Sequence, residues 1–145
     1  MPLRPAQAAD APAITTVFQA ARRTSLPYLP VLHTSEEDHA FFAGLVAAGG
    51  VTVAEVEGAV AAFLALGERL DHLYVHPDHY RQGLGSALLR AAQAARPRLE
   101  LWVFQRNTDA IAFYAAHGFA VVEVTEGVDN EEREPDFLMA WPTMP

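Results

Sequence analysis

Two glycines stand where a short apolar segment passes into a run of good helix formers. The segment from Asp71 to Val75 has the apolar, β-branched and aromatic character of a buried strand, and Pro77-Asp78 marks a turn after it. Residues Arg81 to Ser86 then read Arg-Gln-Gly-Leu-Gly-Ser and lead into a helix. A strand, a glycine turn and a helix N-terminus leave unpaired backbone N–H groups at the positive end of a helix dipole. This arrangement predicts an anion site, most naturally for a phosphate or pyrophosphate.

The same glycines have a purely structural interpretation, a tight turn that lets the helix pack closely on the strand. Two familiar phosphate motifs are excluded, because the sequence has no Gly-Lys-Ser/Thr and lacks the third glycine and downstream acid of a dinucleotide fold. A second strand and helix follow in the segment Leu99 to Phe119. Leu99 to Phe104 has the pattern of a buried strand, Asn107-Thr108-Asp109 can cap a helix from Ala110 to Ala116, and Gly118 can end it.

Together the two segments resemble the GNAT acetyltransferase superfamily. The turn from Tyr80 to Gly85 is similar to its acetyl-CoA motif, Gln/Arg-x-x-Gly-x-Gly/Ala, and departs from it at Tyr80, with Arg81 one place later. The later family pattern, Asn-x-x-Ala-x-x-Phe-Tyr-x-x-x-Gly-Phe, is matched by Asn107, Ala110, Phe113, Tyr114, Gly118 and Phe119. The resemblance covers the chain from about its start to at least Val124.

The resemblance implies acetyl-CoA as co-substrate, with its pyrophosphate held mainly by backbone N–H groups of the glycine turn. Its pantetheine arm would lie along the end of the strand before that turn. The residues expected to contact acetyl-CoA are Leu73, Tyr74, Val75, Arg81, Gln82, Gly83, Leu84, Gly85, Ser86, Asn107 and Tyr114. Asn107 also serves as a plain helix cap, and the two roles are compatible.

Acetyl transfer to an amine needs a base for the ammonium group and an acid for the leaving thiolate. Tyr114 matches the family's tyrosine that protonates the thiolate, and the alternative is a core aromatic beside Phe113. The candidate bases are Asp71 and His72, which are adjacent and therefore point to opposite faces of their strand. Only one of them can face the acceptor, and some family members use a chain of water molecules instead.

The acceptor site is expected in the segments that vary within the family. The loop Thr24 to Thr34 contains Tyr28 and His33, and the acidic stretch Glu126 to Pro135 contains Glu131 and Glu132. We expect these four residues, with Trp102, to line the acceptor site, where the carboxylates would attract a cationic amine. The alternatives are that the apolar residues of the first loop fill the core and that the acidic stretch is a solvated loop.

Composition narrows the function further. The 145 residues suit one domain, 1–145, and the net charge of −8 disfavours nucleic-acid and anionic-membrane surfaces while suiting an amine substrate. The absence of cysteine removes disulfides, thiolate nucleophiles and cysteine-ligated metals. We expect a cytoplasmic enzyme without a metal, and a homodimer by analogy with relatives.

The periodicity predicts an α/β fold with elements in the order β-α-α-β-β-β-α-β-α-β-β. The resemblance implies that the strands form a GNAT-type mixed, mostly antiparallel central sheet flanked by helices. The first half is expected to hold a strand at 2–6, a helix capped by Asp10 that runs towards Arg23, and a helix from Ser35, with Asp38 in a capping box, to Gly49-Gly50. A hairpin of Val51–Val56 and Ala59–Leu66 turns at Glu57-Gly58. Two last strands are expected at 120–125 and 137–141.

Three functions were compared. The first is an acetyl-CoA-dependent N-acetyltransferase that acts directly on a primary amine of a small molecule or peptide. The second is a non-catalytic acyl-CoA-binding sensor, against which the intact Asn107 and Tyr114 argue. The third is a metal-dependent hydrolase that uses His72, His76 and His79, but no second ligand group stands at a familiar spacing.

Overall fold

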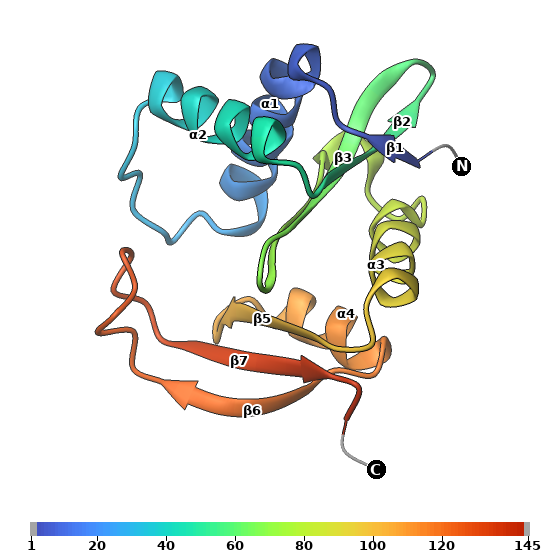
Figure 1. Ribbon diagram of the computed structural model, residues 1–145. Helices are drawn as coiled ribbons and strands as arrows, with labels where there is room; N and C mark the ends of the chain where they lie inside the picture. The colour runs from blue at the N-terminus through green and yellow to red at the C-terminus, as the bar shows by residue number, and fades with distance from the viewer. Residues whose placement is uncertain (1–2, 144–145) are drawn as a thin grey trace.

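The computed structural model describes residues 3–143, and its elements follow the expected order (Figure 1). The Glu57-Gly58 turn has positive φ at both residues, 52° and 81°, as a two-residue hairpin requires. The elements are β1 (Leu3–Pro5), η1 (Ala8–Asp10), α1 (Ala11–Ser25), α2 (Ser35–Ala48), β2 (Val51–Val56), β3 (Ala59–Leu66), β4 (Leu70–Val75), η2 (Pro77–His79), α3 (Leu84–Ala95), β5 (Leu99–Phe104), α4 (Thr108–Ala116), β6 (Ala120–Thr125) and β7 (Asp136–Trp141).

The strands form two antiparallel sheets where we expected one central sheet (Figure 1). One sheet has the order β1-β2-β3-β4 and the other has the order β5-β7-β6. Strands β4 and β5 are neighbours in space, but they share no ladder of hydrogen bonds. Among residues 3–143, one edge of β4 therefore has no strand partner for its backbone N–H and C=O groups, next to the turn that leads into α3.

The first sheet is buried on both faces, and its side chains alternate between two apolar clusters. Val53 and Phe63 pack with residues of α1 and α2, including Phe42. Their neighbours on the other face, Ala54 and Leu64, pack with the leucines of α3 and with the second sheet. The helices α1 and α2 and the helix α3 thus hold β4 between them, and this fixes the place where the glycine turn begins.

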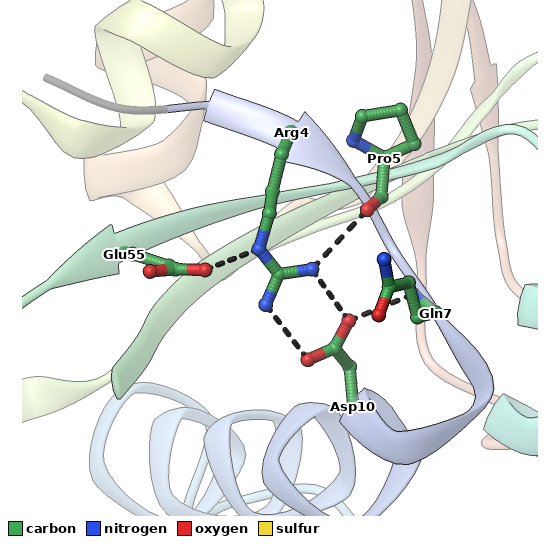
Figure 2. Close-up of polar contacts among 5 residues, drawn as sticks. All are labelled: Arg4, Pro5, Gln7, Asp10 and Glu55. Atoms are coloured by element: carbon green, nitrogen blue, oxygen red, sulfur yellow. Dashed lines mark hydrogen bonds and ion pairs between the residues drawn. The ribbon is translucent and has the colours of Figure 1, made fainter. Parts of the chain in front are cut away.

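Arg4 ties β1 to the start of α1 and to β2 (Figure 2). Its guanidinium donates to both carboxylate oxygens of Asp10, at 2.8 and 2.9 Å, and also pairs with Glu55. These hydrogen bonds lower the pKa of Asp10. Asp10 occupies the N-cap position of α1 as expected, but its side chain accepts from the backbone N–H of Gln7 (2.7 Å) and makes no cap hydrogen bond to α1.

The capping box of α2 lies one residue earlier than expected. Thr34 is the N-cap, and its Oγ1 accepts from the backbone N–H of Glu37 at 3.1 Å. The Glu37 carboxylate accepts in return from the backbone N–H of Thr34 at 2.8 Å. The sequence fits a capping box formed by Ser35 and Asp38 equally well, but both residues lie in the first turn of α2. The loop before α2 therefore ends at Thr34.

Candidate active site

A cavity of about 590 Å³, here called the α3 cavity, opens at the N-terminus of α3 beside the end of β4 and the start of α4. It brings together almost all residues that the sequence predicted to contact acetyl-CoA. These are Leu73, Tyr74, Val75, Arg81, Gly83, Leu84, Gly85, Ser86, Asn107 and Tyr114. Gln82 does not line it, because its side chain turns towards His79, with 3.3 Å between Oε1 and Nδ1.

The glycine turn serves close packing and also leaves the helix end open. Gly83 is the N-cap of α3 in the left-handed conformation, with φ of 80°, and no side chain caps the helix. Gly85 allows a close approach, since an added Cβ would lie 3.4 Å from Cζ of Phe113 on α4. The first-turn N–H groups of α3 therefore sit at the cavity without a side-chain acceptor, as an anion site requires.

Tyr80, the departure from the family motif, makes a contact that the sequence did not predict. Its hydroxyl lies 2.9 Å from Oγ of Ser25, the last residue of α1, and both residues line the α3 cavity. This hydrogen bond ties α1 to the turn that precedes α3. The unusual residue type at Tyr80 was a usable signal, whereas nothing local to Ser25 marked it.

Tyr114 is nearly buried, 8% exposed, and lines the α3 cavity from α4. Burial and then the neighbouring Tyr74 raise the pKa of its phenol above the ordinary value, so the hydroxyl stays protonated at neutral pH. Its ring packs on Phe113 with 5.3 Å between centroids. Tyr114 is thus a core aromatic that also lines the α3 cavity, so its position is compatible with both roles considered from the sequence. Asn107, also at the cavity, caps α4 by accepting from the backbone N–H of Ala110 at 3.3 Å.

Neither candidate base lines a described cavity. His72 lies among aromatic rings, with centroids 5.4 Å from Phe42 and 5.6 Å from Phe41, and its Nδ1 is buried without a hydrogen-bond partner among the described residues. Burial lowers the pKa of His72 to about 4. Asp71 lies at the start of β4, exposed, beside the backbone of Gly67. Alternation predicted opposite faces for the pair. His72 faces the aromatic core, and Asp71 lies at the start of β4, whereas the α3 cavity adjoins the end of that strand.

A second cavity, here called the α1 cavity, measures about 620 Å³ and lies between α1, the loop 26–34 and the β6–β7 loop. It brings together three of the predicted acceptor residues, His33, Glu131 and Glu132. Leu26 lines both this cavity and the α3 cavity, so the two adjoin. Arg22 also lines it, and no pattern in the sequence indicated this position.

The sequence indicated carboxylates that attract an amine, whereas in the structure both glutamates are paired with basic side chains. Glu132 pairs with Arg22 of α1 at 2.6 Å, and Glu131 pairs with Nε2 of His33 at 2.5 Å. The Glu131 hydrogen bond raises the pKa of His33. These pairs join the β6–β7 loop to α1 and to the loop that follows it, and all four side chains line the α1 cavity.

Tyr28 and Trp102 lie outside the α1 cavity. The Tyr28 ring stacks on the guanidinium of Arg106 at 3.9 Å, and Arg106 in turn pairs with Glu134 of the β6–β7 loop at 2.5 Å. Trp102 lines a third cavity of about 490 Å³ on the second sheet, together with Glu132. Trp102 thus shares this third cavity, and not the α1 cavity, with the predicted acceptor residue Glu132.

A partly buried hydrogen-bond network shapes the β6–β7 loop, and no pattern in the sequence predicted it. Asn130 donates to the backbone C=O of Glu134 at 2.7 Å and to the carboxylate of Asp136 at 3.2 Å, and Asp136 also accepts from Thr125. Gly127 has φ of 82°, and an added Cβ would lie 2.4 Å from the backbone of Glu134. These contacts fix the conformation of the loop that carries Glu131 and Glu132.

Within residues 3–143, no group of three or more His, Asp or Glu side chains is placed to hold a metal ion. His76 instead accepts from the backbone N–H of Asp78 at 3.1 Å in the turn after β4. No helix in the described part of the chain is long and apolar enough to cross a membrane.

Comparison with known proteins gives matches of sequence and of fold. Residues 38–121, more than half of the chain, match the acetyltransferase (GNAT) domain family. The chain is 35% identical over 92 residues to the peptidyl-lysine N-acetyltransferase YiaC of Escherichia coli K12, and this alignment covers 62% of each protein, so less than two thirds of the relative's length is matched.

Two solved structures show the same fold. Apo-form YjaB from Escherichia coli has a TM-score of 0.81 at 21% identity over 99% of this chain and 98% of that chain. The PaiA N-acetyltransferase from Thermoplasma acidophilum, solved in complex with coenzyme A, has a TM-score of 0.69 at 15% identity over 96% of both chains. The expected α/β fold is confirmed by these likenesses.

Proposed function

This chain belongs to the GNAT acetyltransferase family, and we propose that it transfers an acetyl group from acetyl-CoA directly to a primary amine of a small molecule or peptide. One observation carries the proposal. The α3 cavity joins an uncapped helix N-terminus, the free edge of β4 and the Tyr114 phenol in a single space. The sequence relative YiaC is named a peptidyl-lysine N-acetyltransferase, which supports a peptide or protein amine as acceptor.

The α3 cavity has the donors that acetyl-CoA needs. Backbone N–H groups from Gly83 to Ser86 would bind the pyrophosphate, with Arg81 adding positive charge. The unpaired edge of β4, from Leu73 to Val75, offers backbone groups to the pantetheine arm and an N–H to polarise the thioester carbonyl. When bound, acetyl-CoA supplies the activated acetyl thioester. The structural relative PaiA was solved with coenzyme A, which agrees with this use of the fold.

Tyr114 would act on the leaving sulfur. Its phenol stays protonated at neutral pH, as a donor must. The raised pKa also makes complete proton transfer to a thiolate less favourable than it would be for an ordinary phenol. We therefore assign Tyr114 chiefly as a hydrogen-bond donor that stabilises the negative charge developing on the sulfur.

The acceptor would enter through the α1 cavity and reach the α3 cavity near Leu26, which lines both. Glu131 and Glu132 would attract the ammonium group, in competition with His33 and Arg22. We assign neither Asp71 nor His72 as base, because both lie outside the two cavities, and propose that water in the cavities removes the proton.

The experiment that tests this function is a screen for CoA release across lysine peptides, peptide N-termini, polyamines, aminoglycosides and amino acids. Acetyl-CoA binding is measured separately by calorimetry. Turnover with one amine class supports the enzyme. Acetyl-CoA binding without acetylation of any amine would favour the alternative, a non-catalytic acyl-CoA sensor, and a lack of acetyl-CoA binding would refute both.

Reversing both acceptor charges should weaken the use of amine but not of acetyl-CoA. In Glu131→Lys/Glu132→Lys we expect the acceptor KM to rise at least about tenfold, because an attractive site becomes repulsive. The KM for acetyl-CoA should stay within about twofold, since neither residue lines the α3 cavity. Glu126→Lys is the matched control, an exposed residue of the same loop outside both cavities. An unchanged acceptor KM would remove the glutamates from the acceptor site.

Three further assignments are proposals of the same kind. We propose that residues 1–145 act as one acetyltransferase domain, since the family match and the α3 cavity together draw on most of the elements. We propose the cytoplasm as location, because acetyl-CoA is made and used inside cells, and a homodimer as assembly. Sedimentation of the purified chain tests the last of these.

A further inference from the structure

The loop 26–34 presents a bare apolar surface to the α1 cavity. Val31 is 91% exposed and Leu32 is 45% exposed, and both line the cavity. Leu26 and Leu29 of the same loop are buried and anchor it, and its two prolines restrict the backbone. Val31 and Leu32 therefore project from a constrained segment. Large apolar side chains held bare beside a cavity indicate contact with an apolar group of a partner.

The other side of the α1 cavity is charged. Its carboxylates are those of Asp38, Glu131 and Glu132, and Glu131 and Glu132 are paired with His33 and Arg22, which also line the cavity. A cationic group that enters could replace either partner beside a glutamate, in agreement with an amine acceptor. Electrostatic attraction between an ammonium group and a carboxylate has little directional preference, so charge alone would not distinguish one amine from another. Discrimination between amines must come from the apolar side.

The geometry points to an acceptor in which an apolar group flanks the reactive amine. The amine would pass the glutamates and meet the α3 cavity near Leu26, while the flanking group would rest on Val31 and Leu32. The two residues are then specificity determinants of the acetyl transfer. This inference rests on the proposed function for the identity of the site, but its binding test does not need turnover.

The experiment compares acceptors that differ only in the flanking group. Leucinamide is paired with serinamide, and a short peptide with leucine on both sides of its single lysine is paired with the same peptide carrying serine. We expect kcat/KM to favour the leucine member of each pair by at least about tenfold. In Val31→Ser/Leu32→Ser the preference should fall close to one, with the KM for acetyl-CoA unchanged.

Val122→Ser/Val124→Ser is the matched control. These valines of β6 are 59% and 60% exposed and lie outside the α1 cavity, so their loss should leave the preference intact. The sedimenting mass of each variant is measured beside wild type. A change of mass in Val31→Ser/Leu32→Ser would show that the apolar surface meets a second copy of the chain, and it would overturn the inference.

Peptide binding is also measured by calorimetry with CoA present, and this separates the two proposals. Preferred binding of the leucine peptide that depends on Val31 and Leu32 supports the inference even where no amine is acetylated, a result that would refute the proposed function. If both members of each pair were used equally and bound equally, the inference would be overturned. The turnover itself would still support the proposed function.

Discussion

Replacing Tyr114 with phenylalanine should lower the rate of CoA release at saturating amine by about 100-fold, the usual effect of removing one donor to a developing negative charge. The phenol lines the α3 cavity, and burial keeps it protonated at neutral pH. Phenylalanine keeps the ring that packs on Phe113 and Phe119, so the fold should be retained. The affinity for acetyl-CoA, measured by calorimetry, should change by at most about tenfold, the range of one neutral hydrogen bond.

Tyr28→Phe is the matched control for this substitution. It deletes the same atom from a buried hydroxyl that has no hydrogen-bond partner among the described residues and that lies outside both cavities. Its rate of CoA release should stay within about twofold of wild type. If Tyr114→Phe retained full activity with folding unchanged, Tyr114 would be only a core aromatic and another group would have to stabilise the sulfur.

The α3 cavity was predictable because most of its lining residues are close in sequence. The strand from Leu70, the turn with Gly83 and the helix α3 form one continuous unit, and their spacing alone puts the N–H groups at the end of the strand. Asn107 is the N-cap of α4, the next helix along the chain, and Tyr114 lies within that helix. Local rules for turns, caps and strand periodicity were sufficient to predict the strand, the glycine turn and the helix, whereas the candidate roles of Asn107 and Tyr114 came from the resemblance to the family.

The acceptor side was less predictable because its contacts join distant segments. Arg22 and Glu132 are 110 positions apart, and His33 and Glu131 are 98 apart, so no local pattern reveals either pair. The sequence indicated that the acidic stretch 126–135 attracts cations, but it could not indicate which side chains of the protein pair with those carboxylates. In the same way, the stack of Tyr28 on Arg106 depends on the position of the second sheet relative to α1.

The faces of β4 show the limit of a periodicity argument. Alternation correctly separates Asp71 from His72, but it does not say which face meets a cavity and which meets the core. Phe18, Phe42 and Phe63 come from three different elements, and their rings pack around His72. Only the packed structure decides that this histidine is part of an aromatic cluster.

The position of His72 predicts a loss of stability in mild acid. Its pKa is lowered from 6.5 to about 4 by burial, with a smaller effect of Arg22. Between these two pH values the unfolded chain binds a proton that the native chain refuses, so the free energy of unfolding falls as the pH falls. The contribution is fully present above pH 6.5, and about 3 kcal/mol of it should be lost by pH 4.

The measurement is urea unfolding of wild type and His72→Phe from pH 8 to pH 4. Phenylalanine suits a cluster of Phe18, Phe41, Phe42 and Phe63 and carries no proton, so the stability advantage of the variant should grow steadily below pH 6.5. His39→Gln, at an exposed position of α2, should follow wild type.

His33 is the histidine that could obscure this result, and its effect has the opposite sign. Its pair with Glu131 raises the pKa of His33, so its contribution to stability is present below pH 6.5 and is lost as the pH rises through the raised pKa. The difference between His72→Phe and wild type cancels it, because both proteins keep the His33–Glu131 pair. A difference that stayed constant across this pH range would mean that His72 is solvated or protonated in the native chain, and the candidate base on β4 would return to consideration.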